Sequence, residues 1–271
     1  MIGLDNIKGM VDSVINFYKM QKLYKDSGIG NEQITMHMVF TGNPGTAKTT
    51  VARLLCGILK DNKVISSGAF VEVGRADLIE KFVGWTAQNV KEKFKEAKGG
   101  VLFVDEAYSL IDDRDGMYGD EAINTIVQCM ENDRDDVIVI FAGYPKKMDD
   151  FISKNPGLRS RIAFNVEFAD YTADELWQIS MLMTERSGMH IEAEAKEKLV
   201  PLFNRERKHE DFGNGRFVRN VVDRAMMNQA SRLASKGFES ISKEMLTLLK
   251  IEDFEMPESK RKEERTIGFM A

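Results

Sequence analysis

The segment from residue 36 to residue 59 constrains the fold of this chain more than any other. It reads as a short apolar run, MHMVFT, followed by the turn GNPGTA and by a stretch with helical periodicity that begins KTT. A strand, a glycine-rich turn and a helix in this order predict a phosphate-binding loop, because the first N–H groups of the helix and its positive end converge on the turn. The residues expected to contact phosphate are Asn43, Pro44, Gly45, Thr46, Ala47, Lys48, Thr49 and Thr50.

Three positions of this loop have specific expectations attached. Lys48 supplies a positive charge near the terminal phosphates, and the Thr49 hydroxyl can bind Mg²⁺. Ala47 stands where the motif usually has its second glycine, so its β-carbon is expected to crowd the phosphates or to strain the backbone. The alternative, a turn that only caps a helix, is disfavoured by the Lys-Thr pair at the required offset. The sequence therefore predicts a nucleotide site whose affinity Ala47 reduces.

A second apolar run, residues 101–104, ends in two acidic residues, Asp105 and Glu106. The carboxyl ends of parallel strands form the edge at which open α/β sheets bind ligands. We expect Asp105 to help hold Mg²⁺ through its hydration shell and Glu106 to orient and polarise the attacking water. Two acids that only cap a strand are the alternative, and the phosphate loop upstream makes it the weaker one.

Strand and helix patterns alternate as far as residue 168, which predicts a three-layer α/β domain with a parallel sheet. The pattern changes at Tyr171, where Thr172-Ala173-Asp174-Glu175 forms a capping box and strand signals end. Helical periodicity continues over 192–206 and 217–235. We therefore expect a nucleotide-binding domain over 1–170, a small all-helical lid over 171–255, and a charged, mobile tail over 256–271.

Composition narrows the choice of partners. The 271 residues carry 38 basic and 43 acidic side chains, a net charge of −5, which disfavours a protein that coats nucleic acid. Cys56 and Cys129 stand alone, so neither a disulfide framework nor a cysteine zinc site is expected, and the cytosol is the expected location. The chain has neither a membrane-spanning run nor a signal peptide pattern.

At this point the chain resembles an AAA+ ATPase. Beyond the phosphate loop and the Asp-Glu strand end, the resemblance rests on residues 155–161 (NPGLRSR) and on the helical C-terminal part. Residues 3–8 (GLDNIK), 105–110 (DEAYSL), 141–145 (FAGYP) and 213–220 (GNGRFVRN) are similar to the branch that contains red-type rubisco activases and stage V sporulation protein K. The resemblance covers nearly the whole chain, and the start of the chain inside a motif leads us to expect a domain cut from a longer protein.

The resemblance implies further roles by position. Residues Ile2, Gly3 and Leu4 correspond to part of the adenine pocket, and Arg216 corresponds to the second sensor in the lid. Arg161, or Arg159 in its place, corresponds to the arginine finger that reaches the nucleotide of a neighbouring subunit; a guanidinium suits this role because it stays charged and binds phosphate through two N–H groups. The loop that grips a client chain in the central pore of such rings corresponds to Lys81, Phe82, Val83 and Gly84.

The function that this resemblance implies is Mg-ATP hydrolysis in a ring of identical subunits, expected to be a hexamer, that remodels a client protein. A finger supplied in trans requires a neighbour, which agrees with a ring. Two alternatives remain open: a DNA-handling motor or loader, which the acidic net charge disfavours, and a nucleotide-gated scaffold with little turnover, which Ala47 suggests. Neither a membrane nor nucleic acid is an expected partner.

Overall fold

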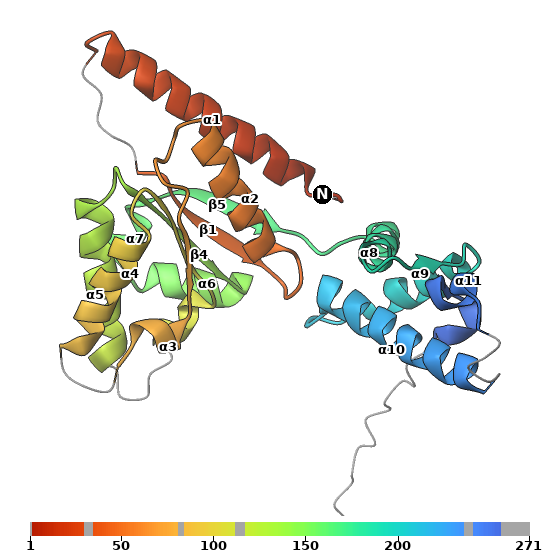
Figure 1. Ribbon diagram of the computed structural model, residues 1–271. Helices are drawn as coiled ribbons and strands as arrows, with labels where there is room; N and C mark the ends of the chain where they lie inside the picture. The colour runs from red at the N-terminus through yellow and green to blue at the C-terminus, as the bar shows by residue number, and fades with distance from the viewer. Residues whose placement is uncertain (1, 30–34, 81–83, 112–116, 236–240, 256–271) are drawn as a thin grey trace, which may run out of the picture.

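The computed structural model describes residues 2–29, 35–80, 84–111, 117–235 and 241–255. Its larger part is built on a sheet of five parallel strands in the order β2-β3-β4-β1-β5 (Figure 1). The strands are β1 (His37–Gly42), β2 (Phe70–Val73), β3 (Gly100–Val104), β4 (Val137–Gly143) and β5 (Ile162–Phe168). Since β1, β3 and β4 are almost wholly buried, they read as continuous apolar runs.

Helices cover both faces of the sheet, which confirms the three-layer α/β prediction. Alternate residues of a strand point to opposite faces, so Met38 and Phe40 of β1 pack with one layer and Val39 packs with the other. The first layer contains α1 (Asp5–Asp26) and α2 (Lys48–Asp61). The second contains α3 (Arg75–Leu78), α4 (Trp85–Glu96), the 3₁₀ helix η1 (Ala107–Ile111), α5 (Met117–Asn132), α6 (Pro145–Ser153) and α7 (Pro156–Arg159).

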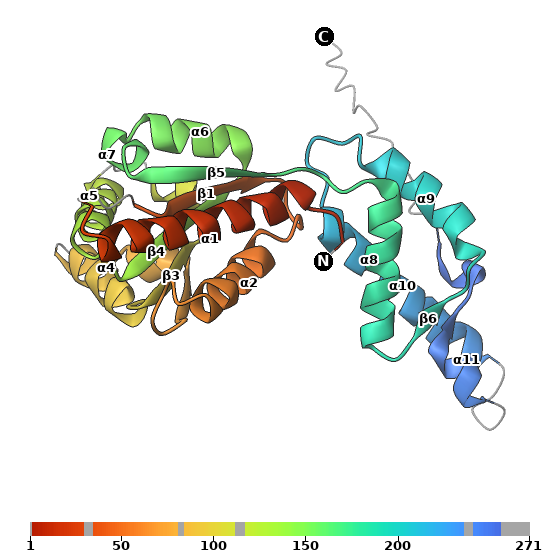
Figure 2. The ribbon, with the colours of Figure 1, turned by 90° about the horizontal axis from the view of Figure 1, so that it is seen from above.

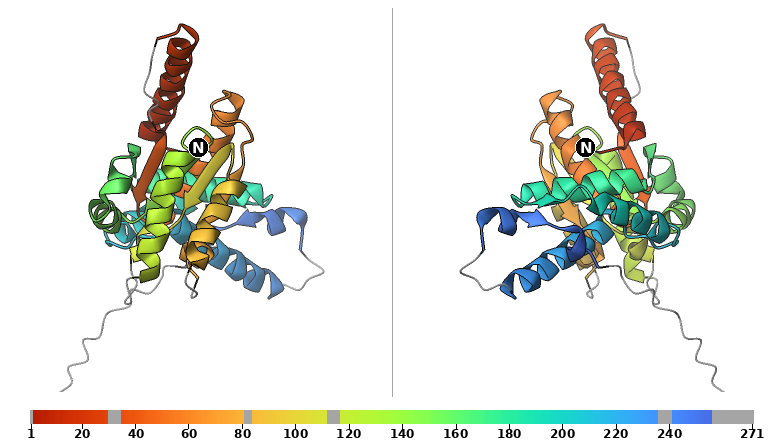
Figure 3. Two further views of the ribbon diagram at one scale, coloured as in Figure 1. Left: turned by 90° about the vertical axis from the view of Figure 1, so that its left-hand side faces the viewer. Right: turned by 90° about the vertical axis from the view of Figure 1, so that its right-hand side faces the viewer.

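A helical lid follows the sheet and lies beyond the carboxyl ends of its strands (Figure 2). Its helices are α8 (Ala173–Arg186), α9 (Ala195–Glu206), α10 (Asn214–Ala234) and α11 (Lys243–Thr247), with a 3₁₀ turn η3 (Ile251–Asp253). Helices α8 and α10 lie at an angle to each other in the side views (Figure 3) and pack with α9 around a separate core that includes Trp177, Phe203 and Val222. The predicted capping box is present, because Thr172 Oγ1 accepts from the Glu175 N–H and the Glu175 carboxylate accepts from the Thr172 N–H.

The prediction of an all-helical lid is wrong in one detail. Two short strands, β6 (His190–Ile191) and β7 (Leu248–Leu249), pair in parallel within it. Gln229 of α10 supports the second strand, since its side-chain amide donates to the carbonyl of Leu248 at 2.8 Å. Strands of two residues leave no periodic pattern in a sequence, and their pairing depends on how distant segments pack.

Two further expectations concern the tail and membrane-spanning helices. The predicted tail, residues 256–271, lies outside the described residues. Among the helices that the structure describes, none combines the length and the apolar character needed to cross a bilayer.

Candidate functional site

The phosphate loop connects β1 to α2 and wraps closely around itself. The Thr46 side chain is buried, and its hydroxyl donates to the Asn43 carbonyl at 2.8 Å. Ala47 is the residue at the start of α2, with φ 70° and ψ 22°. Because this left-handed conformation costs a residue with a β-carbon about 1 kcal/mol, the backbone strain that the sequence predicts at Ala47 is present.

Lys48 is folded back on the loop that carries it. Its Nζ donates to the carbonyls of Gly42 at 2.7 Å and Asn43 at 2.8 Å. Burial lowers the pKa of Lys48 to about 8, the nearby charge of Asp105 opposes this shift, and that of Arg216 adds to it. Within the described residues no carboxylate forms an ion pair with Nζ, so this cation is available to an incoming anion.

Asp105 and Glu106 follow β3 at the edge where the phosphate loop lies. The Asp105 N–H continues the sheet by donating to the Val73 carbonyl at 2.9 Å. Glu106 then has φ 49°, and its N–H donates to Asp105 Oδ1 at 3.0 Å. This turn directs two carboxylates from the end of one strand toward the cavity that Lys48 lines.

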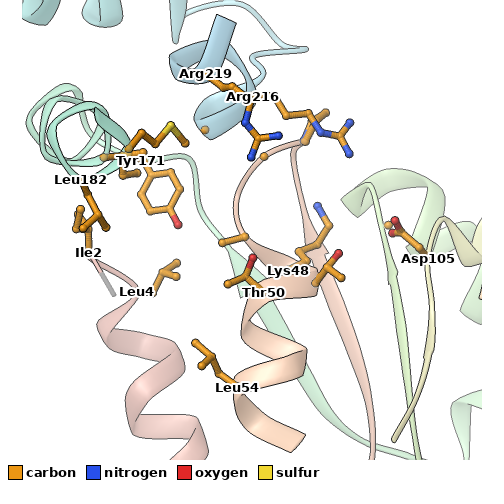
Figure 4. Close-up of a pocket in the computed structure, with 18 of the residues that line it drawn as sticks. Ile2, Leu4, Lys48, Thr50, Leu54, Asp105, Tyr171, Leu182, Arg216 and Arg219 are labelled. Carbon is orange, nitrogen blue, oxygen red and sulfur yellow. The ribbon is translucent and has the colours of Figure 1, made fainter. Parts of the chain in front are cut away.

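That cavity has a volume of about 510 Å³ and lies between the sheet edge and the lid (Figure 4). One side is mainly apolar and comes from three separate parts of the chain, namely Ile2, Leu4, Leu54, Tyr171, Ile179, Leu182 and Met183. The other side carries polar and charged groups, among them Lys48, Thr49, Thr50, Asp105, Glu106, Arg216 and Arg219. An apolar wall beside an excess of cations suits a ligand with a flat apolar end and a polyanionic tail.

Most residues predicted to contact nucleotide meet in this cavity. Those that line it are Ile2, Leu4, Pro44, Gly45, Ala47, Lys48, Thr49, Thr50, Asp105, Glu106 and Arg216. Three do not line it. The Thr46 hydroxyl donates to the Asn43 carbonyl, and the Asn43 amide donates to Asp170 instead. Gly3 packs so closely on the lid that a β-carbon there would lie 2.1 Å from Glu175 Oε1.

The two candidate finger arginines lie away from this cavity. Arg161 directly precedes β5, at the opposite edge of the sheet, and its guanidinium pairs with Glu131 at 3.1 Å. The same side chain donates to the Gly157 carbonyl at 2.9 Å and is 25% exposed. Arg159, at the end of α7, is exposed, and no polar contact of its side chain is found in the described part of the chain.

The predicted pore loop is only partly described. Lys81, Phe82 and Val83 lie outside the described residues, whereas Gly84 is exposed and has φ 83° at the start of α4. Trp85, which follows it, is 59% exposed.

Several residues of the cavity were missed by sequence reasoning. Arg219 stands three residues after Arg216 on α10, and both side chains extend toward the phosphate loop (Figure 4). That spacing places two residues on one face of a helix, so the pair could have been found from the sequence. Tyr171 and Leu182 had no such signal, because apolar residues beside a helix start or on a helix face are usually core residues.

Two family models match successive parts of the chain. A model of the "ATPase family associated with various cellular activities (AAA)" matches residues 38–170, and one of the "AAA lid domain" matches residues 172–265. The chloroplastic ribulose bisphosphate carboxylase/oxygenase activase of Cyanidioschyzon merolae is 40% identical over 93% of this chain and 87% of its own length. Protein CbbX of Cereibacter sphaeroides is 40% identical over 93% of this chain and 82% of its own.

A solved structure shares the fold. The FIGL-1 AAA domain in complex with ADP superimposes with a TM-score of 0.64 at 20% identity, covering 93% of this chain and 80% of that one. Its likeness concerns the fold alone, whereas the two family models and the relatives at 40% identity concern the sequence itself. Taken together with a phosphate loop that faces a helical lid, these findings place the chain in the AAA+ family of ATPases, enzymes that bind and hydrolyse ATP.

Proposed function

We propose that this chain forms a ring of identical subunits, expected to be a hexamer, in which each ATP site is completed by an arginine of the neighbouring subunit. The observation that carries this proposal is that neither finger candidate lines the cavity. Arg159 ends α7 and Arg161 directly precedes β5, at the amino-terminal ends of the strands, so neither is placed to serve the nucleotide of its own subunit. A ring of like-oriented subunits brings this edge toward the next subunit's cavity.

Within one cavity the proposed roles follow from position and charge. Residues 1–170 form the proposed nucleotide-binding domain and 171–255 its lid, with Ile2, Leu4 and Tyr171 beside the adenine. Lys48 and Arg216 bind phosphate oxygens, for which their charges are suited. Glu106 accepts a hydrogen bond from the attacking water and orients it toward the terminal phosphate.

The residues present fit a magnesium ion that arrives with ATP. The Thr49 hydroxyl and the Asp105 carboxylate both line the cavity and both offer oxygen, the ligand that Mg²⁺ prefers. Among the described residues no group of three or more His, Cys, Asp or Glu side chains could hold a metal, so phosphate oxygens would complete the coordination. When bound, the ion would neutralise charge on the phosphates.

A client protein is the proposed target of the ring. The activase among the relatives is named for its action on a protein, ribulose bisphosphate carboxylase/oxygenase, which supports a protein client here as well. Residues 81–84 are the proposed pore loop that grips it, with Phe82 as the gripping side chain, because an aromatic ring offers a large apolar surface without reading sequence. The cytosol is the proposed location.

Mixing two inactive variants tests the shared site. Glu106→Gln should bind ATP without hydrolysing it, and Arg161→Ala should leave every site without its finger. In mixed rings, an Arg161→Ala subunit with intact Glu106 regains a finger from an adjacent Glu106→Gln subunit, so ATPase activity should return. No recovery in any mixture, with mixing verified by labelled subunits, would contradict sharing of Arg161; the same assay with Arg159→Ala decides between the two arginines.

A matched control isolates the finger from the ion pair that Arg161 makes. Glu131→Gln breaks the same pair and leaves the arginine in place. If Arg161 acts on a neighbour's nucleotide, Arg161→Ala abolishes turnover and Glu131→Gln preserves it. Equal losses in both variants would show a structural pair instead.

The client is best approached with the Glu106→Gln variant, which should retain ATP and therefore its client. Phe82→Ala should hydrolyse ATP normally and fail to remodel a captured protein; normal remodelling would exclude the pore role. Tight, salt-sensitive DNA binding would favour a DNA motor, and undetectable turnover by the unaltered protein would favour a scaffold.

A further inference from the structure

The phosphate loop and the lid meet at a hydrogen-bonded joint built around Asp170. This residue lies between β5 and α8, where the chain passes from the sheet to the lid. Its carboxylate accepts from the Asn43 side-chain amide at 3.1 and 3.0 Å, and from the Asn214 side-chain amide at 2.7 Å. Asn43 belongs to the phosphate loop and Asn214 begins α10, so a single carboxylate binds donors from both sides.

Asn214 is held in this position by its other contacts. Its side chain is fully buried, and its Oδ1 accepts from the Tyr171 N–H at 3.0 Å. Because a backbone N–H can only donate, the amide NH₂ must face Asp170. Asn214 also has φ 44°, a costly conformation for a residue with a side chain, which persists when the surroundings fix it.

The backbones on either side of the joint touch as well. The Gly215 N–H donates to the Gly45 carbonyl at 3.1 Å, across the boundary between the lid and the phosphate loop. The next residue of α10 is Arg216, and Arg219 follows in the first turns of the same helix. The orientation of these two arginines in the cavity therefore depends on how the start of α10 is held against the loop.

The loop side of the joint leads directly to Lys48. The Asn43 carbonyl accepts from Lys48 Nζ at 2.8 Å, while the Asn43 amide donates to Asp170. A phosphate that draws Lys48 away from this carbonyl changes the hydrogen bonding of Asn43. The change can pass to Asp170 and then to Asn214, because hydrogen bonds connect these residues in series.

We infer that Asp170 is a positioning residue that couples the phosphate loop to the lid, so that occupation of the loop and the placement of Arg216 and Arg219 depend on each other. The inference rests on the nucleotide site proposed above. A carboxylate suits the task because it has only acceptors and can bind two amide groups at once. Linkage makes the coupling reciprocal: nucleotide should narrow the range of lid positions, and a loosened lid should weaken nucleotide binding.

The first experiment measures the lid in the absence of nucleotide. Ser153→Cys in the sheet domain and Ser235→Cys in the lid provide exposed labelling sites, whereas the native Cys56 and Cys129 are buried. The distance distribution between paired labels should be narrow in the parent protein and broad after Asp170→Asn. Asp174→Asn is the matched control, because it removes the same charge from an exposed residue of α8 that pairs with Lys196. Equal distributions for Asp170→Asn and Asp174→Asn would overturn the inference.

The second experiment measures nucleotide binding. Asp170→Asn should raise the Kd of a non-hydrolysable ATP analogue about tenfold, within the range usual for coupling between sites. In a double-mutant cycle, Asn43→Ala should weaken binding in the parent protein and have little further effect in the Asp170→Asn background. Fully multiplicative effects would show that the residues act independently and would overturn the inference.

The outcomes separate the two hypotheses. If the parent protein fails to bind nucleotide, the proposed site is wrong, and the label distances still decide whether Asp170 holds the lid. If Asp170→Asn does not fold, Asn43→Ala removes the loop side alone and should broaden the same distance distribution; an unchanged distribution would overturn the inference.

Discussion

The two edges of the parallel sheet treat their polar groups in opposite ways. At the amino-terminal edge, His37 is buried, its Nδ1 accepts from the Val139 N–H at 3.0 Å, and its Nε2 lies 3.3 Å from the Met130 carbonyl. At the carboxyl-terminal edge, Lys48 Nζ donates to the Gly42 and Asn43 carbonyls of its own loop, and Arg216 extends into a cavity. Polar groups that are hydrogen-bonded within the core hold the fold together, whereas cations that form no ion pair among the described residues prepare the other edge for an anionic ligand.

Backbone strain is present at the carboxyl-terminal edge. Ala47 and Glu106, with φ of 70° and 49°, both lie at the carboxyl-terminal edge and both line the cavity. Such conformations persist where surrounding contacts enforce them, and they concentrate at functional sites. The comparison predicts that changes at the amino-terminal edge act on stability and that changes at the other edge act on nucleotide binding.

The largest effect is expected from acid, which should lower the free energy of unfolding through His37 at the amino-terminal edge. Burial lowers the pKa of His37 from its ordinary 6.5 to about 4. Between pH 4 and pH 6.5 the unfolded chain binds a proton at His37 that the folded chain does not. The contribution of neutral His37 to the free energy of unfolding is therefore complete above pH 6.5, and it falls by about 3 kcal/mol as the pH drops to 4. Urea unfolding across this range should show a smaller acid loss in His37→Gln, and equal losses would contradict the role of His37. Arg161 and Glu131 are the charged groups near this ring.

Removal of the Lys48 charge should give the next largest effect, on binding. Lys48→Met is expected to weaken ATP binding about a hundredfold, or about 2.7 kcal/mol. The same change should leave folding intact at neutral pH, because burial disfavours the charged form of this lysine and lowers its pKa to about 8. Calorimetric titration and urea unfolding test both halves. Lys95→Met, which alters an exposed lysine of α4 outside the cavity, should change neither.

A smaller effect is expected from relief of the strain at Ala47. Ala47→Gly should stabilise the folded protein by about 1 kcal/mol, since glycine adopts φ near 70° without a steric penalty. ATP affinity should rise in the same variant. Ala52→Gly, in the middle of the same helix, should destabilise by about 1 kcal/mol. If both substitutions destabilise, the conformation of Ala47 is not strained.

The smallest expected change concerns the ion pair between Arg161 and Glu131. Both side chains are partly exposed, so Glu131→Gln should lower the free energy of unfolding by less than about 1 kcal/mol. A loss above about 2 kcal/mol, measured by urea unfolding, would show that this ion pair stabilises the amino-terminal edge of the sheet. It would weaken the case that Arg161 acts as the finger.

Local patterns predicted the parts of this molecule that depend on neighbouring residues in sequence. The apolar runs that became β1 and β3 are buried on both faces, and the capping box at Thr172 needs only Glu175 three residues later. Strand β5 was not identified as such, although Ile162, Phe164, Val166 and Phe168 alternate along it. This alternation of apolar residues is the sequence signal from which the strand could have been predicted.

Contacts between distant segments could not be predicted. Asn43 and Asp170 are 127 residues apart, and Asp170 and Asn214 are 44 apart, so no local pattern joins them. Tyr171 and Leu182 became a cavity wall only because the lid lies across the sheet edge. Periodicity shows which residues of a helix are apolar but not whether they face a core or a ligand.

The close approach of the lid to Gly45 has a practical consequence. A β-carbon at this position would lie 2.3 Å from the Gly213 carbonyl oxygen and 2.8 Å from the backbone nitrogen of Arg216. Even the methyl group of an alanine would therefore clash with the start of α10 and push the lid away from the phosphate loop. Gly45→Ala offers a way to hold the lid open without replacing any charged residue of the cavity, so that the contribution of domain closure to catalysis could be studied apart from that of the side chains.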